Sequence, residues 1–344
     1  MRILIIGGTS FFGKEIVKQA LEAKHEVTVF SRGNARPDFL ERIDHIVGDR
    51  NDASDLAQKL ANEQFDVVID NIAFNGQHVE DVFAALQGNI GRYILTSTTA
   101  VYIGAGPFDQ PLREDAVVYD LPEKPQLASF PKPTGAGMIG YATGKIAAEK
   151  VLVNQKQVPY TIIRPHIVMG PEDNSGRLQF FCQRLLDGKP LILTNGGVQS
   201  LQFVFSRDLA RSYLLALNSQ KAINQAYTLA GSKTCRLVDW VELVAACLGV
   251  QPKLVAVPDD VLQKADFAYA ENWVLRGTLT FDVSKAISDL GFQPSSIENL
   301  TKTAVDWYRQ ATHTDDSPGY QDRDKELAFV EKYLALVNGI DSNT

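Results

Sequence analysis

Tyr141 and Lys145 are residues of this chain whose types and spacing directly suggest chemistry. They lie one helical turn apart in the run Gly-Tyr-Ala-Thr-Gly-Lys over residues 140–145, so their side chains face the same way on a helix. A tyrosine phenol has a pKa of about 10 in water, and a neighbouring ammonium favours the phenolate and lowers that value. Such a tyrosine exchanges a proton with a carbonyl or an alcohol. The same spacing also arises in an ordinary amphipathic helix with one exposed lysine.

A third polar group is expected beside this pair to hold the oxygen of a substrate. Thr98 is the candidate, because it stands in the run Thr-Ser-Thr-Thr-Ala-Val-Tyr over residues 96–102, at the end of an expected strand. In open α/β sheets, ligands bind at the carboxyl ends of the strands. A Thr–Tyr–Lys group at such an edge indicates redox chemistry on a carbonyl or an alcohol.

A glycine-rich turn lies at the start of the chain, where an apolar run leads directly into Gly-Gly-Thr-Ser-Phe-Phe-Gly. Between a buried strand and an amphipathic helix, such a turn is typical of a dinucleotide site, because glycines allow a tight bend and a close approach to phosphate. The N–H groups of the helix N-terminus receive the phosphates. The alternative is a strand–helix turn with no ligand. The residues expected to hold the cofactor here are Gly7, Thr9, Ser10, Phe11, Phe12 and Gly13.

The second expected strand ends in Ser31 and Arg32. An NAD site usually has an acidic residue near this point to bind the ribose 2′-hydroxyl. A hydroxyl and a guanidinium instead suit a 2′-phosphate. We therefore predict a preference for NADP(H), with NAD(H) as the alternative. Arg32 as an ordinary surface residue is the competing interpretation.

Two further segments follow strands and are expected beside the cofactor. Asp49 and Arg50 follow the third strand and are expected to bind the cofactor. The Asp49 carboxylate could accept from an adenine amino group. It could equally cap a helix that starts near Asp52. Asn71-Ile72-Ala73 follows the fourth strand and is expected along the middle of the cofactor.

Strand-like and helix-like runs alternate through the first half of the chain. This alternation predicts an α/β fold with a Rossmann-type, doubly wound parallel sheet, formed by a dinucleotide-binding domain over residues 1–165. The expected strands are Ile3–Ile6, Glu26–Phe30, His45–Val47, Asp66–Ile69, Arg92–Thr96 and Tyr160–Ile163, and the expected helices are Lys14–Ala23, Ala53–Asn62, Val79–Leu86 and Tyr141–Asn154.

The regular alternation breaks at residues 103–138, which are rich in proline and glycine. A long segment of this kind predicts either a lid or a surface insertion. Residues 166–312 predict a smaller α/β substrate-binding cap, partly interleaved with the sheet because a strand at Ala226–Leu229 could return to the sheet edge. Residues 313–344 predict a polar tail that ends in a helix at Lys325–Val337.

The bulk composition is that of a globular protein and excludes several classes of function. The 344 residues are 45% hydrophobic and carry a net charge of −7, which disfavours nucleic acids and anionic membranes as partners. The three cysteines are scattered, and no His, Cys or Asp cluster has the spacing of metal ligands, so we expect no metal. The first apolar run is too short for a signal peptide and no segment could span a bilayer. A cytoplasmic protein that acts on a small-molecule substrate is therefore expected.

Taken in this order, the motifs resemble those of the extended short-chain dehydrogenase/reductase family, the NAD-dependent epimerase/dehydratase group. The resemblance covers roughly Met1 to Thr312. It rests on the glycine turn, Gly48-Asp49-Arg50, the 96–102 run, Tyr141-x-x-x-Lys145, Arg164-Pro165 and Phe203-Val-Phe-Ser-Arg-Asp-Leu-Ala210.

The resemblance implies roles for particular residues. Thr98, Tyr141 and Lys145 would be catalytic, with Lys145 also in reach of the nicotinamide ribose. Pro165, His166 and Ile167 would lie beside the nicotinamide. The helix that holds Tyr141 often forms a dimer face in the family, so a homodimer is left open.

The chain departs from the family pattern in three places. Ser10 replaces the middle glycine, and Thr98 stands where serine is commoner. Leu201-Gln202 stands where sugar-nucleotide epimerases have an arginine that binds diphosphate, which disfavours a UDP-sugar.

The glycine turn with Gly-Asp-Arg also resembles an atypical branch that includes chloroplast stem-loop-binding proteins, some of which bind RNA. We expect an NAD(P)-dependent oxidoreductase, epimerase or dehydratase that acts on a small carbonyl or alcohol, with sugar-like compounds among the candidate substrates. The alternative is a non-catalytic dinucleotide-sensing or RNA-binding protein.

Overall fold

A computed structural model describes residues 1–105, 111–121, 136–265, 267, 279–311 and 319–341. The chain folds as two compact units, and each is built from separate stretches of sequence. The first unit is Met1–Val168, Phe203–Ser232 and Phe281–Ser295, and the second is Met169–Gln202, Lys233–Thr280 and Ser296–Thr344.

A seven-stranded sheet forms the centre of the first unit, and its strands are all parallel. Parallel strands are covered on both faces and therefore read as continuous apolar runs, as in β1, where Ile3 to Ile6 are fully buried. In spatial order the strands are β11 (Gln225–Leu229), β6 (Tyr160–Pro165), β5 (Tyr93–Thr96), β4 (Val67–Asp70), β1 (Arg2–Ile6), β2 (Glu26–Ser31) and β3 (Asp44–Val47).

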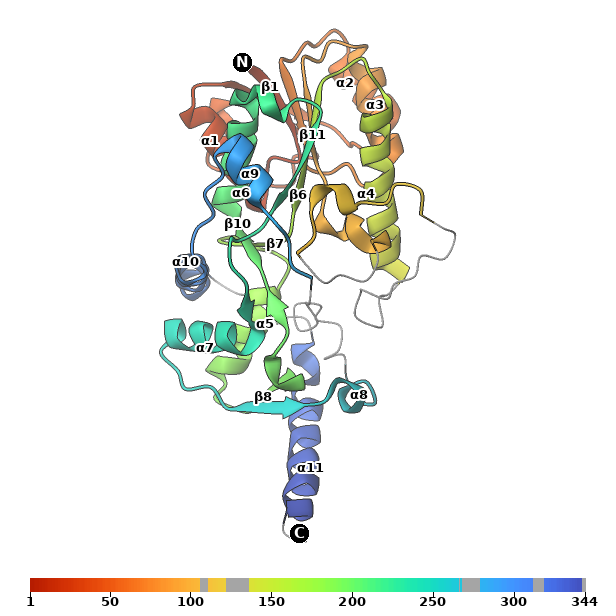
Figure 1. Ribbon diagram of the computed structural model, residues 1–344. Coiled ribbons are helices and arrows are strands. Elements are labelled where there is room, and N and C mark those ends of the chain that lie inside the picture. Colours follow the sequence, from red (N-terminus) through yellow and green to blue (C-terminus); the bar gives the residue numbers. More distant parts are fainter. Residues whose placement is uncertain (106–110, 122–135, 266, 268–278, 312–318, 342–344) are drawn as a thin grey trace. The chain divides into compact units, whose positions relative to one another are not determined.

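Helices cover both faces of this sheet (Figure 1). One face packs on α1 (Phe11–Glu22), α6 (Ser206–Asn218) and α9 (Ser284–Leu290). The other packs on α2 (Ala53–Leu60), α3 (Gly76–Leu86) and α4 (Ala136–Asn154). The predicted α/β fold with a doubly wound parallel sheet is confirmed, and so is the return of a strand near residue 226 to the sheet edge, where β11 pairs with β6.

The order of the strands reverses between β1 and β4, because the chain runs from β1 outward to β3 and then crosses back to β4. Ligands in open α/β sheets bind in the crevice at such a reversal, outside the carboxyl ends of the strands. The glycine turn follows β1 and the Asn71–Ala73 segment follows β4. The fold therefore brings two of the predicted cofactor segments to one edge of the sheet.

The stretch 103–138, predicted as a lid or an insertion, is described in part, since residues 106–110 and 122–135 lie outside the described residues. The described part, 111–121, is tied to the sheet unit at several points. Leu112 forms a bridge with Phe281, and a Glu114 carboxylate oxygen accepts a hydrogen bond from the Thr228 N–H at 2.8 Å. The Tyr119 hydroxyl donates to Glu149 at 3.0 Å. This segment is held as part of the body of the unit.

The second unit is a smaller α/β assembly. Its helices are α5 (Arg177–Leu186), α7 (Leu237–Leu248), α8 (Asp259–Leu262), α10 (Ile297–Gln310) and α11 (Arg323–Asp341). Strand β8 (Leu191–Thr194) is parallel to β13 (Leu254–Val257), and β9 (Ser200–Leu201) is antiparallel to β12 (Cys235–Arg236). The short strands β7 (Ile167–Met169) and β10 (Phe203–Phe205) pair where the chain passes between the units.

Helix α11 is fixed to its own unit at its first turn. The buried Glu326 carboxylate pairs with Arg184 at 3.0 Å and also with Arg323. Arg323 in turn pairs with Asp187 at 2.8 Å. No helix in the described part of the chain is long and apolar enough to cross a bilayer.

Candidate active site

The glycine turn has the geometry of a phosphate-binding loop. Gly7 has a φ of +85°, which favours glycine, and a Cβ atom there would come within 2.9 Å of Ile72. A Cβ at Gly13 would come within 2.4 Å of the Gly7 carbonyl oxygen, so this helix–strand contact excludes a side chain. Ser10, which stands at the usual middle glycine, has an extended backbone with φ −143°. Any residue adopts that conformation, which explains why a serine is accommodated.

The first turn of α1 is free to accept an anion. Ser10 is its N-cap residue, but the serine side chain makes no capping hydrogen bond, and the first turn contains no acidic residue. Phe11 has a φ of 44°, an uncommon conformation for a bulky residue. Backbone strain of this kind clusters at ligand sites. The exposed N–H groups and the positive end of the helix dipole suit a phosphate.

At the end of β2, the Ser31 hydroxyl is hydrogen-bonded to His45 Nε2 at 2.9 Å and accepts from the Gly33 N–H at 3.3 Å. Arg32 and Arg36 are exposed. Among the described residues, no hydrogen bond or ion pair engages either guanidinium. Two guanidinium groups without a partner among the described residues therefore lie close in sequence to Ser31, which is predicted to bind the 2′-phosphate of the ribose.

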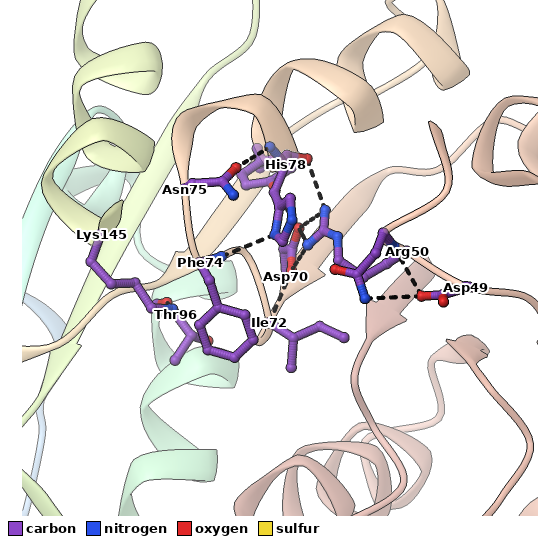
Figure 2. Close-up of polar contacts among 11 residues, drawn as sticks. Asp49, Arg50, Asp70, Ile72, Phe74, Asn75, His78, Thr96 and Lys145 are labelled. Atoms are coloured by element: carbon purple, nitrogen blue, oxygen red, sulfur yellow. Dashed lines mark hydrogen bonds and ion pairs between the residues drawn. The ribbon is translucent and has the colours of Figure 1, made fainter. Parts of the chain in front are cut away.

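Asp49 and Arg50 have different surroundings although they are adjacent. Asp49 is exposed and accepts from the Asn51 N–H at 3.0 Å. Asp52, not Asp49, caps α2, by accepting from the N–H groups of residues 54 and 55. Arg50 is buried, and its guanidinium pairs with the fully buried Asp70 at 3.1 Å and donates to the His78 carbonyl oxygen at 2.8 Å (Figure 2). Its Nε atom has no partner among the described residues.

The loop after β4 is built around Asp70 and Asn71. Asp70 accepts from the Tyr93 hydroxyl at 2.7 Å and from the Ile72 N–H at 3.0 Å. The Asn71 side chain donates to the Gly7 carbonyl oxygen at 3.2 Å and accepts from the Thr96 hydroxyl at 2.7 Å. Asn71 thus links the ends of β1, β4 and β5. Ile72 lies against the glycine turn.

Lys145 is the most buried of the three residues predicted to be catalytic. Its side chain is 1% exposed, and Nζ donates to the Thr96 carbonyl oxygen at 2.7 Å. Nζ also lies 5.9 Å from the centre of the Tyr141 ring, and Tyr141 is 36% exposed. Burial lowers the pKa of Lys145 to about 8, although the carboxylates of Asp70 and Glu149 act in the opposite direction.

Thr98 joins this group through the chain, because it lies two residues after Thr96. It is half-buried, and its hydroxyl oxygen accepts from the Ala100 N–H at 3.2 Å, which caps the short 3₁₀ helix Thr99–Gly104. The described contacts therefore join Lys145 to Tyr141 and to the end of β5, where Thr98 follows.

His166 lies just beyond the end of β6. Its N–H donates to the Leu229 carbonyl oxygen at 2.9 Å, and its Nδ1 is hydrogen-bonded to the Thr99 hydroxyl at 2.8 Å. The ring lies 4.6 Å from that of Phe281. Pro165 is the last residue of β6 and Ile167 the first of β7, and both are buried.

A buried polar network supports the site, and sequence analysis did not anticipate it. The Glu149 carboxylate pairs with the Arg164 guanidinium at 2.7 Å and accepts from the Ser97 hydroxyl. Glu149 lies one helical turn after Lys145 on α4, so its spacing was a usable signal. The ring of Phe74 lies 4.9 Å from Lys145 Nζ. The sequence did not predict this contact, because a single aromatic residue in a loop belongs to no recognisable motif.

These residues fit a nicotinamide dinucleotide. The glycine turn is a backbone loop with no room for side chains at Gly7 and Gly13, and it is followed by a helix N-terminus that has no side-chain cap. Lys145 has three N–H donors, and the Thr96 carbonyl is the hydrogen-bond acceptor that the described residues provide for them. The remaining donors suit the hydroxyls of a ribose.

Comparisons with known proteins agree with this geometry. The family model "NAD dependent epimerase/dehydratase family" matches residues 3–230. The chain is 29% identical over 320 residues to the chloroplast stem-loop binding protein of 41 kDa b of Arabidopsis thaliana. The aligned region covers 87% of this chain and 77% of that protein. It is 24% identical to the 2-alkyl-3-oxoalkanoate reductase of Stenotrophomonas maltophilia, over 72% of this chain and 76% of that protein.

Solved structures share the fold. The UDP-glucuronic acid 4-epimerase from Bacillus cereus, in complex with NAD, superposes with a TM-score of 0.67 at 19% identity, over 90% of this chain and 97% of that one. The dTDP-glucose 4,6-dehydratase from Bacillus anthracis, also in complex with NAD, gives a TM-score of 0.70 at 16% identity, over the same two shares of 90% and 97%.

Proposed function

The chain belongs to the NAD-dependent epimerase/dehydratase family, and we propose that it is an oxidoreductase of that family which acts on a small carbonyl or alcohol through Thr98, Tyr141 and Lys145. The observation that carries the proposal is the placement of Lys145. A buried ammonium is fixed at the end of β5 and lies beside the exposed phenol of Tyr141. An ordinary surface lysine would have no such position.

Each of the three side chains has a distinct task. Tyr141 gives a proton to the substrate carbonyl oxygen, or takes one from the alcohol. Lys145 stabilises the negative charge on the phenolate, because an ammonium acts strongly in a site of low dielectric. Thr98 donates a hydrogen bond that orients the same substrate oxygen. The nicotinamide, when bound, supplies or accepts the hydride.

The cofactor would be held by the segments at the sheet edge. The first turn of α1 binds the pyrophosphate through its N–H groups, and Asn71, Ile72 and Ala73 lie along the middle of the dinucleotide. Pro165, His166 and Ile167 lie beside the nicotinamide ring, as in the family pattern. The Thr9 backbone belongs to the same phosphate turn.

We further propose that NADP(H) is preferred over NAD(H). The free guanidiniums of Arg32 and Arg36 and the hydroxyl of Ser31 would bind a 2′-phosphate. In the sequence, no acidic residue stands directly after β2, where an NAD site usually has one to bind a free 2′-hydroxyl. Asp49 stays available for the adenine amino group, because α2 takes its cap from Asp52.

The substitution Tyr141→Phe tests the catalytic proposal. NADPH oxidation is followed at its absorbance maximum with a panel of aldehydes and ketones, and NADPH affinity is measured by fluorescence titration. The variant should lose turnover by at least about a hundredfold, the usual contribution of a general acid, and keep its affinity for NADPH. Tyr227→Phe, which removes a hydroxyl that donates to the Lys221 carbonyl oxygen beside the edge strand β11, is the control and should keep full activity. Unchanged turnover in Tyr141→Phe would refute the proposal.

The relationship to the Arabidopsis protein supports a second candidate, the binding of RNA, because that relative is named a stem-loop binding protein. The net charge of −7 weighs against it. Filter binding with a stem-loop RNA at about 150 mM salt separates the two, since RNA recognition predicts saturable binding and the redox function does not.

A further inference from the structure

Phe74 is an exposed aromatic residue beside the proposed catalytic pair. It lies in the loop between β4 and α3, next to Asn75, which caps α3 by accepting from the His78 N–H. The Phe74 side chain is 47% exposed. A single exposed apolar side chain is ordinary on a protein surface, so it is the neighbours of this ring that indicate its role.

The ring of Phe74 packs on the two functional side chains of α4. Its centre lies 4.9 Å from Lys145 Nζ, within the range of a cation–π interaction. It lies 6.4 Å from the centre of the Tyr141 ring, with the two planes inclined by 50°. Figure 2 shows Phe74 next to Lys145, with Thr96 close by. The Lys145 ammonium therefore has two neighbours here, the Phe74 ring and the Thr96 carbonyl oxygen.

The backbone of Phe74 is fixed from both sides. Its N–H donates to His78 Nδ1 at 3.2 Å. Its carbonyl oxygen lies so close to α4 that a Cβ at Gly144 would come within 2.2 Å of it. Gly144 stands between Tyr141 and Lys145, so the loop and the helix touch at the residues of interest. Phe74 is thus placed by contacts that are independent of its ring.

The charged groups around Lys145 are already paired with other partners. Asp70, on β4, pairs with Arg50, which lies in the loop after β3, and Glu149, on α4, pairs with Arg164. Neither carboxylate forms an ion pair with Lys145 among the described residues, and burial is the largest influence on the pKa of this ammonium. Access of water is consequently the main variable that sets the state of this ammonium.

We propose that Phe74 is a positioning residue of the redox site: its ring keeps water away from the Lys145 ammonium and holds that ammonium beside the Tyr141 phenol. This inference rests on the proposed function for its catalytic meaning. The ring itself touches neither proton nor hydride in the reaction. It acts by keeping Lys145 dry and in place.

The experiment is a pH titration of Lys145 in the full chain, followed by NMR with ¹³Cε-labelled lysine. The Lys145 signal is assigned by its loss in Lys145→Arg. In the wild type the pKa of Lys145 should be about 8. Phe74→Ala should raise this pKa by about one unit, because water then reaches the ammonium and stabilises its charge. Phe74→Tyr, which retains the ring, should restore the wild-type value.

Two further variants separate shielding from the attraction of the ring. Phe74→Leu keeps an apolar cover but removes the π-system, so it should leave the pKa at or slightly below the wild-type value. Phe83→Leu alters another phenylalanine of the same unit, which packs on Tyr93, and should change nothing at Lys145. An unchanged or lowered pKa in Phe74→Ala would overturn the inference.

The titration needs no substrate, so its outcome is separate from that of the proposed function. If the Phe74 variants behave as expected but the wild type turns over no carbonyl, the proposed function fails and the contact remains. If turnover occurs and depends on Tyr141, the alkaline limb of the rate profile should move with the same variants. A limb that stays in place in Phe74→Ala would also refute a positioning role.

Discussion

The carboxylate of Glu149 and the guanidinium of Arg164 form a doubly hydrogen-bonded ion pair, with N–O distances of 2.7 and 2.9 Å and side chains that are 0% and 1% exposed. Glu149 lies on α4 and Arg164 lies near the end of β6. Ser97, next to Thr98, donates to the same carboxylate. The pair therefore links the helix that holds Tyr141 to the strand ends that hold the other site residues.

Glu149→Gln should lower the free energy of unfolding by about 3–5 kcal/mol, because it leaves the Arg164 charge buried without its partner. Urea denaturation measures the change. Lys150→Gln is the matched control, since it breaks the neighbouring but exposed pair with Asp120 and should cost less than about 1 kcal/mol. Equal losses of unfolding free energy in the two variants would show that the buried pair stabilises the protein no more than the exposed pair does.

Gly144→Ala and Gly140→Ala should have opposite effects although both add a methyl group to α4. At Gly144 the added Cβ would come within 2.2 Å of the Phe74 carbonyl oxygen, whereas nothing lies within 4 Å at Gly140. We expect Gly144→Ala to destabilise the protein by roughly 1–3 kcal/mol and Gly140→Ala to stabilise it by about 0.5–1 kcal/mol. Thermal unfolding of both variants checks this, and stabilisation by Gly144→Ala would contradict the contact.

Arg32→Ser should weaken NADPH binding by about tenfold or more and leave NADH binding unchanged. The physical reason is the loss of charge-assisted hydrogen bonds to the 2′-phosphate, each of which is worth roughly 1.5–3 kcal/mol. Paired titrations with the two cofactors provide the measurement. Arg42→Ser changes another exposed arginine of the same unit and should alter neither affinity. A parallel loss of both affinities in Arg32→Ser would argue against a 2′-phosphate site.

Lys145 should make the stability of the cofactor-free protein depend on pH. Its pKa is about 8 in the folded protein and 10.5 in the unfolded chain. Between these values the unfolded chain binds more protons, so the free energy of unfolding rises as the pH goes from about 8 to 10.5 and falls as the pH is lowered through the same window. The free energy of unfolding of wild type relative to Lys145→Met should therefore rise by about 2 kcal/mol from pH 7 to pH 10.

Urea unfolding at several pH values measures this dependence. Lys150→Met, which removes an exposed lysine five residues further along α4, is the reference for general effects of pH. Its difference from the wild type should stay nearly constant. A flat difference for Lys145→Met as well would mean that the folded protein does not hold Lys145 away from water.

Local patterns in the sequence predicted the sheet well, because apolar runs such as Ile3–Ile6 alternate with helical spacing and each pattern depends on near neighbours. The return of residues near 226 to the sheet edge was also foreseen. Whether Asp49 contacts the adenine or caps α2 could not be settled from the sequence, because its carboxylate lies close to the start of that helix. The structure gives this cap to Asp52.

The contacts that define the site could not be predicted in the same way. The ion pair of Arg50 with Asp70, twenty residues further along the chain, had no signal in the sequence, and the binding of the cofactor by Arg50 stays a prediction. Phe74 meets Gly144 and Lys145 only after α4 has packed on the loop that follows β4. Contacts between residues far apart in sequence depend on how the elements pack together, and no local pattern carries that information.

The late position of the edge strand β11 in the sequence has a consequence for folding during synthesis. This strand is formed by residues 225–229, and helix α9, which packs on it, is formed by residues 284–290. Both are synthesised long after β6 has left the ribosome. At about 5–20 residues per second, β6 therefore waits several seconds or more with an unpaired edge. During that interval the nascent chain offers a template for wrong pairing with other strands, so chaperone dependence should be greatest while residues 165–229 are being translated.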